Sequence, residues 1–578
     1  MSKPAHWQLP TLDEDEVSRL ASKLGIHEPA ARVLVKRGYA DPAAARRFLD
    51  ASLSDLHDPF LLKDLQPAVE RLWKAVRGGE KIRLYGDYDA DGTTAVVLLK
   101  TVIQLAGGDV SHHVSDRLKD GYGMRAEAIA RAAGDGVRLV ISVDTGIRAA
   151  EAVKEAARLG VDVIVTDHHV PEAELPPALA VLNPNRADDT YPDKNLCGAG
   201  VAFKLAQALM GKLGWPEEKL RRMTESLLKL VAIGTVADVV PLTGENRILV
   251  KHGLEGLGDL RNPGLRALFE VAGFTEGQAP TAGQIAFRIA PRLNAAGRMA
   301  NANDVIDLLS TCDENRAHEL AAQLHAFNQE RQQTENDIIQ SILEECSRAP
   351  VGDDQAALVV SGPGWHRGVV GIVANRLVER FHRPVIVLSE DPQEGLAQGS
   401  GRSVPKFNLL QALESMPELF ERFGGHRQAV GVSLRIGKVE EFRARLNAYA
   451  AARLAQDDFR SQIDLDAVIG FGEVNDECVA EILSLAPFGA GNPTPLFGVF
   501  DVEVASDPVI WKQRHLRLRL RGNGRTLACR AWNFAERIDE VRAGARVDAV
   551  VQFEPDPYSQ SRGYSPWCVT LRDVRAAE

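Results

Sequence analysis

The sequence predicts an α/β protein whose main sheet is mostly parallel. Short apolar runs at 81–86, 138–143 and 161–166 alternate with stretches of helical character, which is typical of βαβ units. The length of 578 residues exceeds what one hydrophobic core supports and corresponds to about three to five domains. An apolar share of 45% and a charged share of 25% match ordinary globular proteins and exclude a disordered or fibrous chain.

We expect five parts in chain order, and each has its own pattern. A helical lead-in is followed by the parallel α/β part, a long helix without Gly or Pro, a second α/β part and a strand-rich part. Their expected bounds are 1–55, 56–312, 313–350, 351–457 and 458–578. The expected strands beyond those above are 179–183, 356–361 and 383–389, and the expected helices are 93–107, 146–159, 313–348 and 369–381.

Composition also indicates the compartment. No stretch approaches the ~18 apolar residues of a membrane span, and the N-terminal residues lack the apolar core of a signal peptide. The six cysteines are far apart without a C-x-x-C pair, which excludes common zinc and thioredoxin patterns and suits a reducing environment. We therefore expect a cytoplasmic protein, with a monomer as the default assembly.

An acidic turn follows the first predicted strand. It reads Gly86-Asp87-Tyr88-Asp89-Ala90-Asp91-Gly92. Three carboxylates in one turn cannot all be buried without cations, because desolvation costs several kcal/mol per ion. A solvated acidic turn or a calcium loop is the alternative, although the EF-hand pattern fails for lack of Glu at its twelfth position.

Further acidic and imidazole side chains follow later strands. Asp144 ends the strand at 138–143, Asp167-His168-His169 follow the strand at 161–166, and Asp238 lies beyond a predicted helix. Any one Asp could simply cap a helix. Because parallel strands deliver their carboxyl ends to one edge, we expect these side chains to converge. Several carboxylates with imidazole suit Mn²⁺ or Mg²⁺, and two such ions ~3.5–4 Å apart would support phosphoester hydrolysis.

These motifs resemble those of a known family. Four segments resemble, in order and spacing, the motifs of the DHH phosphoesterase superfamily: GDYDADG, VDTG with its Asp, TDHH and TVADVVPL. Three further motifs narrow the resemblance to the RecJ family of single-stranded-DNA-specific 5′→3′ exonucleases: PRLNAAGRM (291–299), SGRS (400–403) and FGGH (423–426). The resemblance extends from about residue 60 to the end. The resemblance implies a DHH domain, a connecting helix, a DHH-associated domain and a C-terminal OB-fold barrel. It also implies release of 5′-mononucleotides in DNA recombination and repair.

The resemblance assigns metal ligands by motif. Asp87, Asp89 and Asp144 would hold one ion, and Asp91, Asp144, His168 and Asp238 the second, with Asp144 bridging. His169 would contact the scissile phosphate and stabilise its developing charge. Asp144, His168 and His169 are thus the implied catalytic residues. Many superfamily members have His where Asp87 stands, and the Asp form fits RecJ.

A second group of residues is implied to bind the substrate end. Arg298, Ser400 and Arg402 would form a pocket for a 5′-terminal phosphate, with Gly425 and His426 in a nearby glycine-rich turn. Glycines admit backbone N–H groups to a phosphate, and arginine grips it bidentately. Alternatively, these glycines only make turns. For Trp365, His366 and His426, the sequence allows either contact with the substrate or a structural role.

An alternating Leu/Arg strand stands near the C-terminus. In 515–521 the leucines would pack inside a barrel while Arg517, Arg519 and Arg521 face outward to bind single strands. Trp511 and Trp532 are candidate stacking residues. A solvated strand face is the alternative. A local basic strand reconciles nucleic-acid binding with the net charge of −11.

Two other functions compete with the exonuclease interpretation. One is a DHH phosphodiesterase of short oligonucleotides or cyclic dinucleotides, against which the arginine strand argues. The other is a non-catalytic nucleic-acid scaffold, against which the full ligand set argues. No G-x-x-x-x-G-K-[ST] motif indicates a nucleotide-driven motor. Single-stranded DNA is the expected partner, and the resemblance implies a single-strand-binding protein and a RecQ-type helicase.

Overall fold

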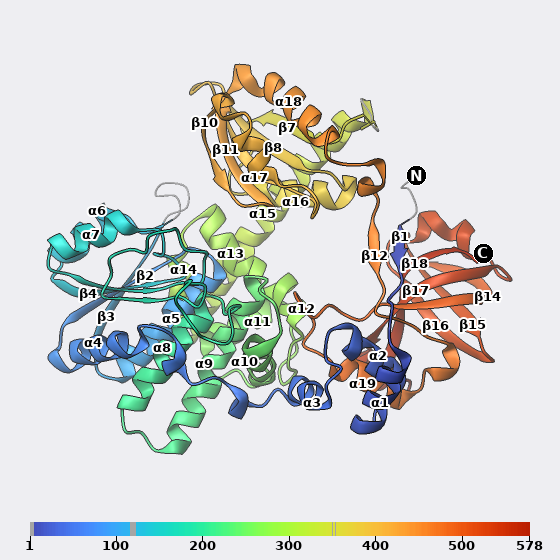
Figure 1. The fold of residues 1–578 in the computed structure, drawn as a ribbon, viewed down its shortest axis with the longest axis horizontal. Helices are drawn as coiled ribbons and strands as arrows, with labels where there is room; N and C mark the ends of the chain where they lie inside the picture. The colour runs from blue at the N-terminus through green and yellow to red at the C-terminus, as the bar shows by residue number, and fades with distance from the viewer. Residues whose placement is uncertain (1–4, 116–122, 349–350, 353, 578) are drawn as a thin grey trace. The chain divides into compact units, whose positions relative to one another are not determined.

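The computed structural model describes residues 5–115, 123–348, 351–352 and 354–577 (Figure 1). The chain forms two compact units. The larger unit contains residues 7–294, 302–321 and 463 onward, and the smaller contains 295–301 and 322–462. Among the helices of the described ranges, none combines the length and the apolar character needed to cross a bilayer.

A five-stranded sheet organises the first part of the larger unit. Its order is β3-β2-β4-β5-β6, and every neighbouring pair is parallel. The strands are β2 (Lys81–Gly86), β3 (Asp109–Val114), β4 (Val137–Val143), β5 (Asp162–Thr166) and β6 (Ala180–Leu182). The parallel α/β prediction is confirmed. Strand β3 was not predicted, because DVSHHV is a polar, partly exposed edge strand without an apolar run.

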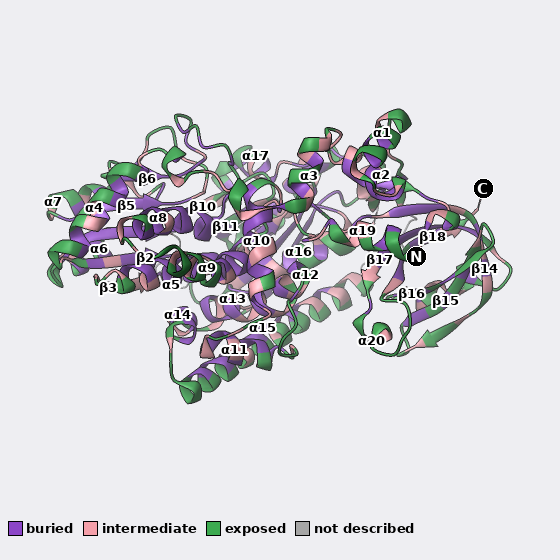
Figure 2. Ribbon diagram, turned by 90° about the horizontal axis from the view of Figure 1, so that it is seen from below, coloured by how far each residue is buried: buried purple, intermediate pink, exposed green. Residues whose placement is uncertain are grey.

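Helices cover both faces of this sheet. The apolar residues of α6 and α7 share one core with Tyr85, Val140 and Val163 of the strands. Helix α5 packs on the sheet and against α8 and α9, and the strands between these layers are largely buried (Figures 1 and 2). These helices are α4 (Leu65–Gly78), α5 (Ala90–Leu105), α6 (Ala126–Gly134), α7 (Ala150–Arg158), α8 (Gly198–Lys212) and α9 (Glu217–Ala237).

More helices follow before the long one. They are α10 (Gly244–Gly256), α11 (Pro263–Val271), α12 (Ala282–Gln284), the π-helical turn η3 (Ile285–Ile289), α13 (Ala290–Met299) and α14 (Asn303–Ser310). Helix α15 (Glu314–Arg348) is a single helix, where the sequence allowed either one helix or two in line.

The C-terminal strands close into a barrel. The order β14-β15-β16-β18-β17 is closed by pairing of β14 with β17, and β16 runs parallel to β18. The elements are β12 (Gln462–Asp464), β13 (Ala467–Val468), α19 (Asp476–Ser484), β14 (Phe497–Trp511), β15 (His515–Gly522), β16 (Arg525–Ala531), β17 (Arg546–Pro555), α20 (Pro557–Gln560) and β18 (Trp567–Ala576). This is the strand order of an OB fold, which confirms the predicted barrel.

The N-terminal helices pack on this barrel. Apolar residues of α1 (Glu14–Leu24), α2 (Glu28–Lys36) and α3 (Pro42–Asp50) belong to the barrel's own hydrophobic core. Two partly buried ion pairs reinforce the contact: Arg37 lies 3.0 Å from Asp466, and Arg32 lies 2.7 Å from Glu473. Gln8 of β1 (His6–Gln8) accepts a backbone hydrogen bond from Leu465. The expected lead-in is therefore part of the barrel's packing.

The smaller unit has a mixed five-stranded sheet of order β10-β11-β9-β8-β7. Only β7 and β8 are parallel, and the other pairs are antiparallel. Its elements are β7 (Leu358–Pro363), α16 (Val370–Phe381), β8 (Val385–Asp391), β9 (Leu396–Arg402), α17 (Leu409–Glu414), β10 (Phe420–Gly425), β11 (Ala429–Arg435) and α18 (Val439–Ala451). The predicted second α/β segment is therefore present.

Candidate functional site

The acidic and imidazole side chains converge at one edge of the parallel sheet. Asp87 follows β2, Asp144 follows β4, the two histidines follow β5, and Asp238 caps the C-terminus of α9. Three sets have ligand atoms within 4.8 Å of one another: Asp87, Asp89 and Asp144; Asp91, His168 and Asp238; and Asp144, His168 and His169. Every metal-ligand candidate from the sequence therefore lies in this cluster.

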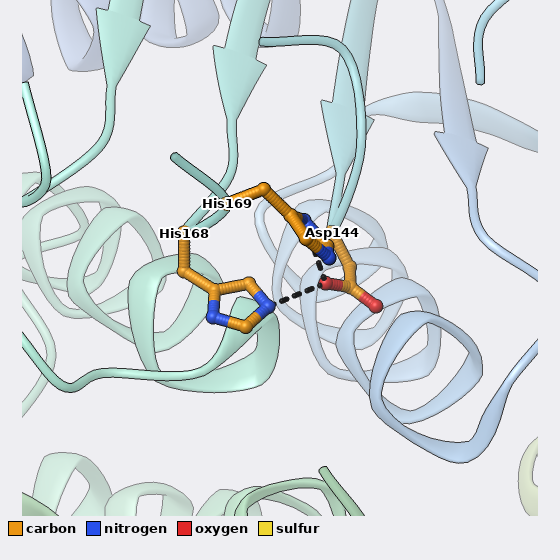
Figure 3. A group of neighbouring side chains, drawn as sticks. All are labelled: Asp144, His168 and His169. Carbon is orange, nitrogen blue, oxygen red and sulfur yellow. Dashed lines mark ion pairs between the residues drawn. The ribbon is translucent and has the colours of Figure 1, made fainter. Parts of the chain in front are cut away.

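Asp144 is the centre of the cluster. One of its oxygens lies 3.1 Å from His168 Nε2 and 4.0 Å from His169 Nδ1 (Figure 3). Its backbone has φ of +59°, in the left-handed region, and its amide donates to the carbonyl of Thr166. Such a conformation in a non-glycine residue costs about 1–3 kcal/mol and persists because its surroundings hold it. The strained turn aims the carboxylate into the cluster.

The N-terminus of α8 holds Asp91. The backbone N–H groups of Gly198 and Ala199 donate to its two carboxylate oxygens at 2.6 and 2.9 Å. A Cβ on Gly198 would lie 2.5 Å from Asp144 Cβ, and one on Gly234 would lie 2.7 Å from an Asp91 oxygen. Two glycines thus allow α8 and α9 to approach the carboxylates closely. Sequence reasoning missed these positions because neither glycine carries a reactive side chain.

Asn294 supports the acidic turn from another helix. Its side-chain oxygen accepts a 2.8 Å hydrogen bond from the backbone N–H of Ala90, and Asp89 caps α5 by accepting from Gly92. Asn294 lies on α13, within the PRLNAAGRM segment. That segment served only as a family motif in the sequence, so this contact was not predicted.

Asp167 makes the two histidines chemically different. It is fully buried, and its Oδ1 lies 2.7 Å from His169 Nδ1 while Oδ2 accepts from the backbone of Ile147. Burial opposes protonation of His169, but the Asp167 hydrogen bond and charge raise its pKa to about 9. Burial, and then the positive charge of His169, lower the pKa of His168 to about 4. A neutral imidazole therefore stands beside a cationic one.

The carboxylates repel one another in this buried site. Burial and the neighbouring acidic groups raise the pKa of Asp144 well above its usual range, that of Asp91 to about 6 and that of Asp238 to about 9. Asp144 Oδ1 and His168 Nε2 are buried and lie 3.1 Å apart, but neither makes a hydrogen bond with the other or with any other described residue. Buried polar atoms normally have partners. Oxygen-rich donors with one imidazole fit divalent cations such as Mn²⁺ and Mg²⁺.

The predicted end-binding residues gather in the smaller unit at the start of α16. Arg298 donates to the carbonyl of Gly368 at 3.2 Å. A Cβ on Gly371 would lie 3.4 Å from the Arg402 guanidinium and 3.5 Å from the Ser400 hydroxyl. Two arginines and a hydroxyl therefore surround a helix N-terminus, which is a favourable arrangement for an anion.

The glycine-rich hairpin stands next to this group. Gly425 has φ of +141°, and a Cβ there would lie 2.3 Å from the carbonyl of Ala429, so the tight turn requires glycine. His426 is exposed on the same turn, and Ala429 pairs with Arg402 across β11 and β9. Trp365 is partly buried and packs against the core beside α16.

The barrel carries the arginine strand as predicted. Leu516, Leu518 and Leu520 are buried, and the arginines between them are exposed. A groove of about 760 Å³ crosses the outer face of β15 and β16, and its lining includes Arg517, Arg519, Arg525, Arg530 and Trp567.

Acidic residues also belong to this face, and Asp476, Asp507 and Asp556 line the groove beside the arginines. Arg521 lies outside the lining of the groove, and it pairs at 3.7 Å with Glu503 of the neighbouring strand. This pairing was not predicted, because Glu503 is distant from Arg521 in the sequence.

Aromatic rings cluster at one end of the arginine strand. Trp511 and Trp532 have ring centroids 5.3 Å apart, and His515 packs against Trp532 at 4.9 Å. The Arg517 guanidinium lies over the Trp511 ring at 4.7 Å. Trp532 is exposed, so its ring is accessible for stacking.

Three family models match the chain. They are the DHH family N-terminal domain over 81–235, the DHHA1 domain over 354–452 and the RecJ OB domain over 465–564. The single-stranded-DNA-specific exonuclease RecJ of Bacillus subtilis is 39% identical over 95% of this chain and 68% of that protein. The Escherichia coli protein of the same name is 37% identical over 80% of this chain and 82% of its own length. A crystal structure of RecJ with Mn²⁺ from Thermus thermophilus matches all of this chain and 80% of that one, with a TM-score of 0.84 and 32% identity.

Proposed function

The chain belongs to the RecJ family of single-stranded-DNA-specific exonucleases, and on that premise we propose that it hydrolyses single-stranded DNA from the 5′ end with two divalent metal ions. The products are 5′-mononucleotides, and the reaction serves DNA recombination and repair. The observation that carries the proposal is the pair of ligand sets at the sheet edge, which Asp144 joins through its contact with His168.

Each set would hold one Mn²⁺ or Mg²⁺ ion. Asp87, Asp89 and Asp144 form the first, and Asp91, His168 and Asp238 form the second together with Asp144. Two such ions supply an activated water for in-line attack and neutralise charge on the phosphate. The low pKa of His168 keeps its imidazole neutral at pH 7, which is the form that binds a metal.

His169 has a different part in the reaction. Asp167 engages Nδ1 and keeps the imidazole cationic at neutral pH, so the ring can offer a positive charge and a proton to the substrate. A fixed cation next to the ligands would stabilise charge that develops on the scissile phosphate.

Arg298, Ser400 and Arg402 would bind the terminal 5′-phosphate. The N-terminus of α16 adds backbone N–H groups and a favourable dipole to their charges. Capture of the strand end in this way would give the enzyme its polarity, with Gly425 and His426 shaping the adjacent wall. Arg402→Ala should therefore impair 5′-phosphorylated strands more than 5′-hydroxyl strands. An equal loss on both would contradict end recognition.

The barrel groove would hold the rest of the strand. Arg517 and Arg519 line it, and exchanging both for Ala should raise the KM for long strands more than for trinucleotides and reduce the salt dependence of binding. Arg521→Ala is the matched comparison, because Arg521 already pairs with Glu503, and we expect a smaller effect. An equal effect of all three arginines would favour a diffuse basic face over a groove.

The decisive test uses a single-stranded DNA oligomer labelled at either end, with Mn²⁺, Mg²⁺ or chelator. We expect metal-dependent release of labelled mononucleotide from the 5′ end, while 3′-labelled strands shorten progressively. Asp144→Ala should abolish hydrolysis and leave strand binding largely intact. Hydrolysis of dinucleotides but not of longer DNA would instead favour a short-oligonucleotide phosphodiesterase, and no hydrolysis would favour a scaffold.

We further propose that the protein works in the cytoplasm as a monomer. Its wider partners would be a single-strand-binding protein and a RecQ-type helicase, which would supply the single strands it degrades. Co-purification with each candidate, with and without DNA, tests these contacts.

A further inference from the structure

The loop that carries the two site histidines is held by its backbone carbonyls. His168 and His169 lie outside any helix or strand, so secondary structure offers these carbonyls no partner. Two asparagine side chains supply the donors instead. The side-chain amide of Asn185 donates to the carbonyl of His168 at 2.6 Å. The side-chain amide of Asn183 donates to the carbonyl of His169 at 2.8 Å.

The topology of the parallel sheet brings these asparagines to the loop. Asn183 directly follows β6, which is the parallel neighbour of β5. The carboxyl ends of parallel strands meet at one edge, so the chain after β6 runs beside the chain after β5. The backbone N–H of Asp167 donates to the carbonyl of Leu182 at 3.0 Å, which continues this pairing up to the histidines.

The two asparagines form one unit. Asn183 is fully buried and Asn185 is partly buried, and the backbone N–H of Asn185 donates to Asn183 Oδ1 at 2.8 Å. Arg186 closes the turn by donating its backbone N–H to the carbonyl of Asn183 at 3.2 Å. Pro184 stiffens the segment between the asparagines because its ring fixes φ. Loss of the Asn183 side chain would therefore also release Asn185.

Each histidine is consequently fixed on both sides of its backbone. One carboxylate oxygen of Asp167 accepts from the backbone N–H of His168 at 2.7 Å and from that of His169 at 3.1 Å. The asparagines hold the two carbonyls. With these peptide groups held, the side chains leave the backbone in set directions, and both imidazoles lie against Asp144 (Figure 3).

We propose that Asn183 and Asn185 are positioning residues of the metal centre. Asn185 fixes the backbone of His168 and so aims its imidazole at the second set of metal ligands. Asn183 fixes the backbone of His169 and, through Asn185, that of His168 as well. This inference rests on the proposed exonuclease function and deepens it, because it names residues outside the ligand sets that determine where the two imidazoles stand.

Alanine variants should give two different results in Mn²⁺ calorimetry and steady-state kinetics. Asn185→Ala releases only His168, so we expect Mn²⁺ affinity to fall about 10-fold while kcat at saturating Mn²⁺ changes less than about 3-fold. Asn183→Ala releases both histidines. We expect its Mn²⁺ affinity to fall about 10- to 100-fold and its kcat to stay about 100-fold low at saturating Mn²⁺.

Substitutions at Asn185 test the hydrogen bond itself at a partly exposed position, where the fold should tolerate a change. Asn185→Leu has a similar volume but no donor, so it should bind Mn²⁺ as weakly as Asn185→Ala. Asn185→Gln keeps a side-chain amide and should recover part of the affinity. Equal Mn²⁺ affinity in the wild type, Asn185→Leu and Asn185→Gln would contradict a positioning role for Asn185.

Asn262→Ala is the matched control for a general loss of stability. Asn262 also precedes a proline, donates to a carbonyl at 3.0 Å and accepts from the backbone N–H of Leu265 at 2.8 Å. It caps α11 and contacts no histidine of the metal centre. Asn262→Ala should lower the Tm through loss of this cap and keep Mn²⁺ affinity and kcat within about 2-fold of the wild type.

Two results would overturn the inference. One is an Asn183→Ala protein with wild-type Mn²⁺ affinity and wild-type kcat. The other is an equal loss of Mn²⁺ affinity in Asn183→Ala and Asn262→Ala, which would assign the effect to general destabilisation. Calorimetry requires no hydrolysis. A wild-type protein that binds Mn²⁺ but degrades no strand would therefore contradict the proposed exonuclease function and leave the comparison of Mn²⁺ affinities intact.

Discussion

Gly198→Ala should disable the metal centre without adding or removing a charge. The new methyl carbon would lie 2.5 Å from Asp144 Cβ, 2.7 Å from its Cγ and 2.8 Å from its Oδ1. Ordinary carbon contacts begin at 3.4 Å, so the two groups must separate by about 0.9 Å. Asp144 already has a left-handed backbone, and the amide of Gly198 holds Asp91 at 2.6 Å. Movement of Asp144 would displace its own carboxylate, and movement of residue 198 would displace the carboxylate of Asp91.

The expected loss follows from that displacement. A misplacement of about 1 Å at a catalytic site costs roughly 10²-fold in rate, which corresponds to about 2.7 kcal/mol. Crowding of a packed interior lowers the free energy of unfolding by about 1–3 kcal/mol. We therefore expect kcat to fall about 100-fold, together with a 10- to 100-fold loss of Mn²⁺ affinity.

The assay measures kcat on a labelled strand, Mn²⁺ binding by calorimetry and strand binding in chelator. Gly211→Ala is the matched control, because Gly211 lies on the same helix and a Cβ there meets no atom within 4 Å. That control should keep full activity and gain about 0.5–1 kcal/mol of helix stability. A Gly198→Ala protein with kcat within 3-fold of the wild type would refute the proposed crowding of Asp144.

Three further predictions concern other parts of the structure. Asp167→Asn removes the charge that keeps His169 cationic, so the alkaline fall in kcat/KM near pH 9 should move to lower pH, and kcat should drop about 100-fold in a pH–rate profile. Because Asp91 and Asp238 have raised pKa values of about 6 and about 9, the metal-free protein is most stable when they are protonated and loses stability as pH rises through these values. The Tm gain from Mn²⁺ in scanning calorimetry should therefore be larger at pH 9 than at pH 6, and an equal gain would contradict the repulsion. Arg247→Met removes three hydrogen bonds to backbone carbonyls and should lower the free energy of urea unfolding by about 3 kcal/mol. Arg247→Lys should restore little of this stability, because lysine lacks the planar guanidinium group that donates to several carbonyls at once.

The residues of the acidic cluster could be found from the sequence. Asp87, Asp144 and His168 could be placed at one sheet edge because apolar strands are recognisable locally and parallel strands share a carboxyl end. The alternating 515–521 strand likewise predicted which side chains face inward. The domain boundaries and the roles of individual site residues stay predictions, because the fold alone does not test them.

The contacts that position the site were beyond such reasoning. Asn294 meets Ala90 across 204 residues, and Gly198 meets Asp91 across 107 residues. A small or neutral residue in a helix has no neighbouring sequence pattern that indicates which carboxylate or acidic turn it contacts in the folded protein. The sequence therefore identifies the candidate metal ligands, but it does not identify the residues whose contacts position those ligands.

The sequence by itself determined four of the five strands of the parallel sheet, the long helix and the acidic edge, because periodicity and strand-end chemistry act over short stretches of chain. Only the tertiary structure decided that the N-terminal helices complete the barrel core, that Glu503 pairs with Arg521 and that Asp167 separates the two histidines electrostatically. The physical reason is that these features depend on burial and on charges brought together by folding. Spacing along the chain does not determine either.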